Sequence, residues 1–227
     1  SWYRRQRQMC IRDSPKVFWN QILHCDAGPN VVRAYPVTND GAGYKAKIEN
    51  VMTGTRDKWF RPADVCVAPD GSVFVTDWYD PGVGGHGQRD LERGRIFRIA
   101  PPNVNYTIPD HDLESLEGCV EALKSPAGSV RYLAWTRLHE ADEKAIQPLL
   151  ELTKNDDPRM RARAIWLLGK IPASTEMSIN MAQKDGDSDI RCVALRLARQ
   201  TNHNVIGVCE ARAGDPSPQV RREIAIA

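Results

Sequence analysis

The sequence predicts strands and helices in separate parts of the chain: the last one to two blades of a β-propeller over residues 15–102, then an α-solenoid over residues 114–227. Short β-branched runs separated by Asp-Gly turns precede Pro101-Pro102, a pattern typical of β-hairpins. After residue 113 the apolar residues follow helical spacing and repeat every 30 residues, which is typical of stacked helix pairs. Residues 103–113 are the predicted linker.

Residues 1–14 are expected to lie outside the fold. The segment Arg4–Ser14, RRQRQMCIRDS, is similar to the translation of a sequencing adapter, so we interpret residues 1–14 as a disordered scar. A natural basic arm is the alternative. The 227-residue chain has a net charge of +2, but without the four arginines and one aspartate of this segment it holds 27 basic and 28 acidic residues. The chain's basicity therefore does not indicate a nucleic-acid partner.

The first predicted hairpin is turned by Asn39-Asp40-Gly41, and a second unit resembles one propeller blade. In that unit Pro69-Asp70-Gly71 joins the first two strands, and a Gly-rich loop leads to the third. The predicted strands are Val31–Val37, Tyr44–Met52, Ala63–Val67, Val73–Asp77 and Arg95–Ile99. About one and a half blades are visible, whereas a closed propeller needs at least four. We therefore expect the chain to be a fragment of a longer protein.

The second part contains about four copies of a helix pair. Each second helix begins apolar–Arg–x–x–Ala, a stripe expected to be buried along one face, and the acid before it suits an N-cap or first-turn site. The pattern resembles HEAT repeats. The predicted first helices are Leu116–Leu123, Glu143–Thr153, Met177–Lys184 and Val205–Arg212. The chain stops at Ala227 inside the last predicted helix, so we expect the solenoid to be truncated there.

An arginine recurs in each copy, at Arg131, Arg161, Arg191 and Arg221. Such a column could bind phosphate. The alternative is that each arginine pairs with an acid four residues earlier or in the adjoining repeat. We favour the ion pairs, because no aromatic residues are interleaved for stacking bases.

The five cysteines outside residues 1–14 do not form a metal or redox motif. Cys25, Cys66, Cys119, Cys192 and Cys209 are far apart, and the sequence contains no Cys-x-x-Cys. We expect free, mostly buried thiols and no metal site. No apolar run approaches the roughly 18 residues of a membrane span.

Two polar clusters in the strand part are candidate ligand-binding sites, although the catalytic residues are unknown. Asp77 and Asp80 end a strand before the Gly-rich loop that carries His86, and they could bind a cation or polarise a hydroxyl. The loop matches G-x-G-x-x-G but leads into a strand, so we reject a dinucleotide site. The second cluster is His24, Asp26, Asn30 and Arg33. For each of these residues a structural hydrogen bond is the alternative.

Long motifs carry a resemblance to a known family. FWNQILHCDAGPNVVRAYPV, WFRPADVCVAPDGSVFVTDWYDPGVGGHGQRDLERGRIFRIAPP and the helical segment after them resemble large proteins of planctomycetes and verrucomicrobia that are named as membrane-bound dehydrogenases. In that family a propeller similar to glucose and sorbosone dehydrogenases precedes HEAT repeats, and many members end in a c-type cytochrome domain. The resemblance implies periplasmic or extracellular localisation for the full-length protein.

Two functions follow as expectations. The first is a sugar or alcohol dehydrogenase-like module coupled to electron transfer, with a quinone cofactor and haem c in the full-length protein but no cofactor in this stretch. The second is a non-catalytic propeller–solenoid scaffold that binds a polysaccharide or a protein partner on its helices. A sugar or polyol is the expected small ligand, and we expect neither a nucleic-acid partner nor a membrane span.

Overall fold

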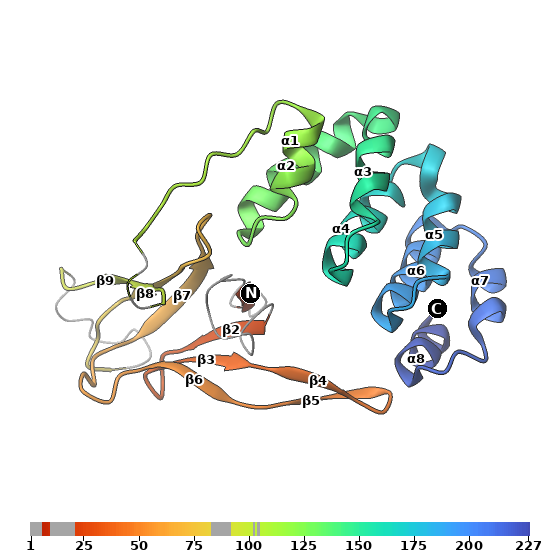
Figure 1. The fold of residues 1–227 in the computed structure, drawn as a ribbon. Coiled ribbons are helices and arrows are strands. Elements are labelled where there is room, and N and C mark those ends of the chain that lie inside the picture. Colours follow the sequence, from red (N-terminus) through yellow and green to blue (C-terminus); the bar gives the residue numbers. More distant parts are fainter. Residues whose placement is uncertain (1–5, 10–20, 83–91, 102, 104) are drawn as a thin grey trace. The chain divides into compact units, whose positions relative to one another are not determined.

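A computed structural model describes residues 6–9, 21–82, 92–101, 103 and 105–227 (Figure 1). Within these ranges the chain forms strands up to Ile99 and helices from Leu116 onward. It divides into two compact units, one consisting chiefly of residues 1–38 and 45–110 and the other chiefly of residues 111–124 and 129–227. The prediction of β and α structure in separate parts is confirmed.

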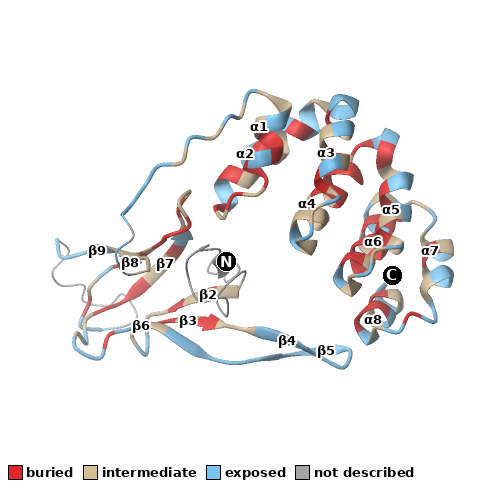
Figure 2. Cartoon of the chain, viewed as in Figure 1, coloured by how far each residue is buried: buried red, intermediate tan, exposed pale blue. Residues whose placement is uncertain are grey.

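The described strands form small sheets. Antiparallel pairing in the order β1-β2-β3-β6 joins Gln6–Met9, Gln21–Asp26, Val31–Tyr35 and Glu49–Thr53. Strands β4 (Val37–Asp40) and β5 (Gly43–Ala46) pair with each other, and all their residues are exposed (Figure 2). The antiparallel sheet β7-β8-β9 joins Pro62–Val67, Val73–Asp77 and Arg95–Ile99.

The turn between β7 and β8 forms at the predicted Asp-Gly. Gly71 has a φ of +85°, a left-handed conformation that glycine adopts without a steric penalty. The Asp70 carboxylate accepts a hydrogen bond from the Ser72 amide at 2.9 Å. This short-range chemistry explains why the sequence locates β8 correctly from Val73 to Asp77.

The two larger sheets share one apolar core. In β2 the alternate residues Leu23 and Cys25 are buried, whereas His24 and Asp26 between them are partly exposed. From the other sheet Val65, Val73 and Val75 join the same core, and Phe60 meets Phe97 edge to ring at 5.7 Å. The side-chain alternation of the strands therefore leaves His24 and Asp26 on the polar face.

Part of the segment interpreted as a scar is paired. Gln6–Met9 form β1, which lies antiparallel to β2 from Gln21 to His24, so the expectation that residues 1–14 pack against nothing is wrong for these four residues. Pairing at a sheet edge uses backbone N–H and C=O groups and needs no particular side chains. The rest of residues 1–14 lies outside the described part of the chain.

Helices follow in pairs with a 30-residue period. The first helices of the pairs are α1 (Leu116–Ala122), α3 (Ile146–Leu152), α5 (Thr175–Gln183) and α7 (Val205–Arg212). The second helices are α2 (Gly128–Glu140), α4 (Pro158–Leu168), α6 (Ser188–Thr201) and α8 (Pro218–Ile226). Helix α3 begins later than predicted, after the 3-10 turn Asp142–Ala145, because Pro148 lacks the N–H that would extend the helix back toward residue 144.

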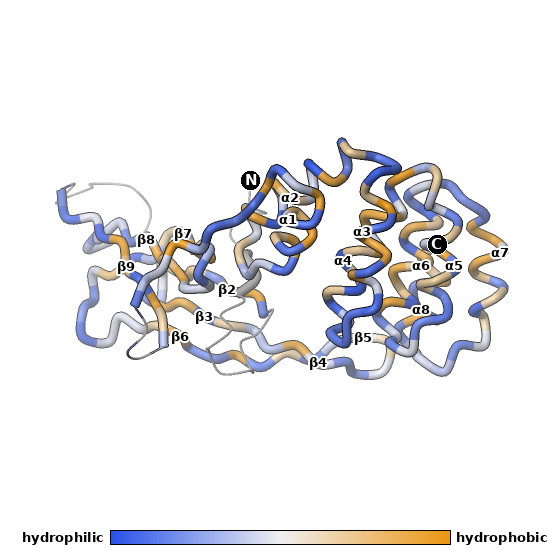
Figure 3. The backbone as a smooth tube through the Cα atoms, turned by 45° about the horizontal axis from the view of Figure 1, so that its top comes forward, coloured by the Kyte–Doolittle hydropathy of each residue, from blue (hydrophilic) through white to orange (hydrophobic). Residues whose placement is uncertain are grey.

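The repeated apolar columns lie between the helices, as predicted. Ala134, Ala164 and Ala194 are fully buried, and so are Leu138 and Leu168 one turn further on. Hydrophobic and hydrophilic residues are interspersed along the helices (Figure 3). Met160 is an exception to the predicted core, because it is only partly buried and its sulfur lies 3.5 Å from the Arg163 guanidinium.

Candidate functional site

Asp77, the central residue of the candidate site, is a fully buried structural acceptor. One carboxylate oxygen accepts hydrogen bonds from the backbone amides of Arg61 at 2.7 Å and Tyr79 at 2.9 Å. The other accepts from Arg95 Nε at 2.8 Å, and the side chain is 0% exposed. Both oxygens are therefore occupied by the fold, and the carboxylate has no surface to offer a substrate.

Arg61 connects the two predicted polar clusters. Its guanidinium donates to the carbonyls of Asp80 at 2.9 Å and Pro81 at 3.2 Å. It also donates to Ala27 at 3.1 Å and Gly28 at 3.4 Å. The residue is only 7% exposed. The loop that follows β8 thus lies beside the turn that follows β2, and a buried arginine holds them together.

Asp80 and Asn30 also act on the backbone. The Asp80 carboxylate accepts from the Gly82 amide at 2.7 Å, and the Asn30 side chain donates to the carbonyls of Lys58 at 3.0 Å and Phe60. Asn30 has a φ of +59°. A Cβ on Gly54 would lie 2.8 Å from the Asn30 Cβ, so this packing requires glycine.

His24, Asp26 and Arg33 are on the polar face of β2 and β3. Arg33 forms an ion pair with Asp26 at 3.1 Å, with both side chains about one-third exposed. His24 lies opposite Arg33 in the strand register, and its Nδ1 atom is buried without a hydrogen-bond partner within the described residues. His86, the seventh predicted residue, lies outside the described part of the chain.

An ionic and aromatic cluster that the sequence analysis did not single out adjoins Asp77. Arg95 bonds Asp57 at 2.8 Å as well as Asp77, and it lies 4.3 Å from the centre of the Tyr79 ring. Trp59 contacts the same ring at 5.5 Å. The hydrogen bond from Arg95 lowers the pKa of Asp57. Tyr79 has a φ of +51°, and such strain at a non-glycine residue is found where surrounding contacts hold it.

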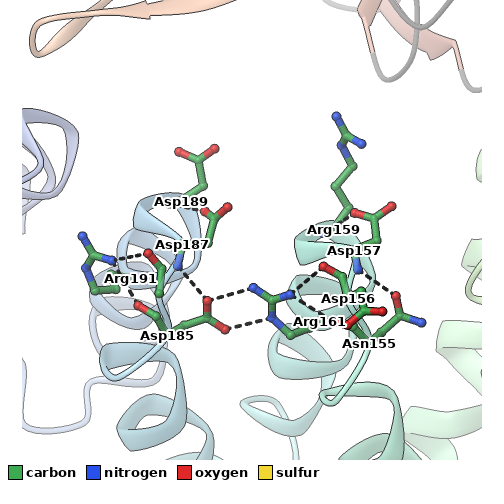
Figure 4. Close-up of polar contacts among 10 residues, drawn as sticks. Asn155, Asp156, Asp157, Arg159, Arg161, Asp185, Asp187, Asp189 and Arg191 are labelled. Atoms are coloured by element: carbon green, nitrogen blue, oxygen red, sulfur yellow. Dashed lines mark hydrogen bonds and ion pairs between the residues drawn. The ribbon is translucent and has the colours of Figure 1, made fainter.

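Two of the four arginines in the column, Arg161 and Arg191, form ion pairs between successive helix pairs. Arg161 makes two hydrogen bonds to the Asp185 carboxylate, at 2.9 and 3.0 Å, and Arg191 makes two to Asp215, at 2.8 and 3.0 Å. Figure 4 shows Arg161 between Asp185 and the carbonyls of its own repeat, at Asn155 and Asp156. The partner is in the adjoining repeat, which was one of the predicted alternatives.

The acids four residues before these arginines have a different role. Asp157 accepts from the Arg159 amide at 2.9 Å and Asp187 from the Asp189 amide at 2.8 Å. Both cap the start of a helix, where free N–H groups need an acceptor. Because Arg161 and Arg191 already make several hydrogen bonds, these two arginines do not present free guanidinium groups to a phosphate.

Residues 9–103 match a domain of unknown function, DUF7133. No curated protein matches the chain. The match covers the strand part and stops before the helices, so it coincides with the unit that holds all seven candidate residues. Within the described residues of the chain, no group of three or more His, Cys, Asp or Glu is arranged to hold a metal ion. None of the described helices is long and apolar enough to cross a membrane.

Proposed function

We propose that this chain is a non-catalytic propeller–solenoid scaffold whose helix pairs bind a partner molecule. The observation that carries the proposal is the state of Asp77: its side chain is 0% exposed, and both oxygens accept hydrogen bonds from the fold. A general base or a sugar-binding carboxylate must reach its ligand at hydrogen-bond distance. Asp80 and Arg61, its neighbours, likewise bond the backbone.

The finer architecture is part of this proposal. We interpret the strand part as the end of a β-propeller, which is supported by two small antiparallel sheets that share one core. We interpret the helical part as a HEAT-like solenoid, which is supported by the 30-residue period and the ion pairs between repeats. Stacked helix pairs create extended surfaces suited to partner binding.

The competing proposal is the dehydrogenase-like module that the family resemblance implies. Because this stretch alone is expected to show no turnover under either proposal, a full-length protein that carries it is assayed for dye-linked oxidation of a panel of sugars and alcohols, with a quinone cofactor and Ca²⁺ added. Asp77→Asn is the comparison variant, and circular dichroism checks its folding. We expect no dye reduction above the level without protein.

Binding is measured in parallel on arrays of polysaccharides and peptides. Binding to a polysaccharide or peptide on the arrays, without dye reduction in the oxidation assay, supports the scaffold. Substrate-dependent dye reduction that is lost in folded Asp77→Asn would overturn it, and would show that the carboxylate becomes accessible during turnover. Binding to neither array would also count against the scaffold.

A further inference from the structure

A groove of about 360 Å³ lies between helices α5 and α7. Helix α5 with its C-cap Lys184 contributes residues spaced i, i+3, i+4, i+7 and i+8 from Glu176, and α7 contributes Gly207, Val208, Ala211 and Arg212, with His203 and the N-cap Asn204 before it. Residues at this spacing share one helix face. Two lysine and arginine side chains, Lys184 and Arg212, occupy one end of the groove, and Glu176 lies at the opposite end of the α5 stripe.

Lys184 departs from a pattern that the preceding repeats follow. At the equivalent positions Lys124 forms an ion pair with Glu121, three residues earlier, and Lys154 forms one with Glu151 at 2.8 Å. In the third repeat Met181 replaces the glutamate, and Lys184 has no ion pair within residues 105–227, all of which are described. Its ammonium group is therefore free to meet an external anion.

Arg212 is a second departure in the same groove. The equivalent residues of the earlier repeats, Ala122, Leu152 and Ala182, are small or apolar and buried. The Arg212 guanidinium lies 3.8 Å from Asp215, whose oxygens already accept from Arg191. Its Nε atom is buried and has no hydrogen-bond partner within the described residues. An arginine with an unused donor costs stability, so its presence here favours a role in binding.

The floor and rim of the groove suit a polypeptide. Ile179 and Val208 are buried at its base, and Asn180, Gln183 and Asn204 bring carboxamides to its sides. Carboxamides both donate and accept, as a peptide backbone requires. Gly207 stands where the preceding repeat has Met177, and glycine inside a helix costs about 1 kcal/mol relative to alanine. A Cβ at Gly207 would lie 2.6 Å from the Asn204 side chain, so glycine lets this carboxamide pack against α7 at the side of the groove.

We propose that this groove binds a short extended acidic peptide, with a carboxylate at Lys184 and Arg212 and an apolar side chain over Ile179 and Val208. The two contact points are four residues apart on α7 and five apart along α5, a rise of about 6 to 7.5 Å. Alternate residues of an extended strand are about 6.6 Å apart. The fitting motif therefore has an apolar and an acidic residue separated by one position. This inference rests on the proposed scaffold function and names its partner chemistry.

Fluorescence anisotropy of the full chain tests the proposal with two fluorescein-labelled pentapeptide amides, Gly-Val-Ser-Glu-Gly and the reversed order Gly-Glu-Ser-Val-Gly. We expect one of them to bind, and its Glu→Gln counterpart to bind about tenfold more weakly. Lys184→Glu is expected to weaken binding at least about tenfold. Lys154→Glu, the same change one repeat earlier, is the matched control and is expected to have no effect. Gly207→Met, which copies the preceding repeat, is expected to block the groove.

Three results would overturn the proposal that this groove binds an acidic peptide. The first is equal affinity for the Glu and Gln peptides, and the second is an equal loss of affinity in Lys184→Glu and Lys154→Glu. The third is displacement of the peptide by an equal concentration of inorganic phosphate, which would indicate a simple anion site. Failure of both peptides to bind would overturn it as well. If other peptides on the array still bind, the scaffold function stands without this groove, whereas dye-linked turnover would reject the scaffold function itself.

Discussion

Arg61 shows how a buried polar side chain can determine the path of two loops. Its guanidinium bonds backbone carbonyls on both sides, at Ala27 and Gly28 and at Asp80 and Pro81. A planar guanidinium directs several N–H groups at once, whereas an ammonium group on a flexible stem cannot replace that geometry. Neighbouring residues in the sequence do not reveal this role, because the carbonyls are 19 to 34 residues away.

Arg61→Lys should therefore destabilise the strand part. We expect a loss of about 2 kcal/mol, because buried carbonyls that lose a charged donor are left unsatisfied. Chemical denaturation followed by Trp fluorescence measures it. Arg56→Lys, an exposed site in the same part of the chain, is the control and should change stability by less than about 0.5 kcal/mol.

The cysteines should differ in reactivity because they differ in burial. Burial raises the pKa of the Cys192 thiol to about 11, and burial also raises the pKa of Cys119. Cys66 is exposed. Because the thiolate is the reactive species, iodoacetamide at pH 8 should label Cys66 well before Cys119 and Cys192, as read by peptide mass spectrometry. Early labelling of Cys192 would show that α6 opens in the native state.

At the scale of elements, repetition made the helical part more predictable than the strand part. The columns headed by Val130 and Arg131 locate the second helices, and the acids Asp185 and Asp215 recur at the same 30-residue interval, so the pairing between repeats was detectable. The clamp of Arg95 on Asp57 joins residues 38 positions apart and occurs once. A contact that occurs once leaves no repeating pattern in the sequence. The candidate site was therefore only partly predicted.

The ion pairs between repeats should contribute measurably to stability. Asp185→Asn copies Asn155 at the equivalent position, whose side-chain oxygen accepts from the Asp157 amide at 2.9 Å much as Asp185 accepts from Asp187 at 2.8 Å. The turn is thus preserved while the charge is removed. We expect a loss of about 1.5–3 kcal/mol, the usual contribution of a charged hydrogen bond, in urea unfolding followed by circular dichroism. An unchanged midpoint would mean that these pairs do not couple the repeats.

The same acids should make the helices sensitive to low pH. The hydrogen bond from Arg191 lowers the pKa of Asp215. Burial would raise the pKa of Asp185, but the bonds from Arg161 outweigh it and the net pKa is lowered. A carboxylate with a lowered folded-state pKa stabilises the fold above its unfolded value of about 3.9 and loses that contribution as the pH falls through the folded pKa. Unfolding free energy should therefore drop below about pH 4, and less steeply in Asp215→Asn.

At the scale of the whole molecule, the two units differ in the interactions by which they can take up an additional segment of chain. Strand β2 has an edge that pairs with β1, and pairing at a sheet edge uses backbone N–H and C=O groups that any segment can supply. The helical unit, by contrast, depends on side chains at fixed intervals. Segments added to the strand unit can therefore be absorbed more easily than segments added within the helices.

Deletion of residues 1–14 should change the thermal midpoint little. Backbone hydrogen bonds at an exposed edge replace bonds to water and contribute little net free energy, so we expect a shift below about 2 °C. Differential scanning fluorimetry measures it, with and without the segment. A shift above about 4 °C would mean that the segment belongs to the fold.

The bonds between helix pairs also constrain how such a protein can lengthen. At two junctions an arginine reaches forward to an acid 24 residues later in the next copy, from Arg161 to Asp185 and from Arg191 to Asp215. A tandem duplication of 30 residues within 161–215 copies one arginine and one acid together, so the junctions in this segment keep their pairs. A duplication of any other length leaves an arginine or a carboxylate without its counterpart. Duplications that lengthen the helical part are therefore expected to add whole multiples of one 30-residue repeat.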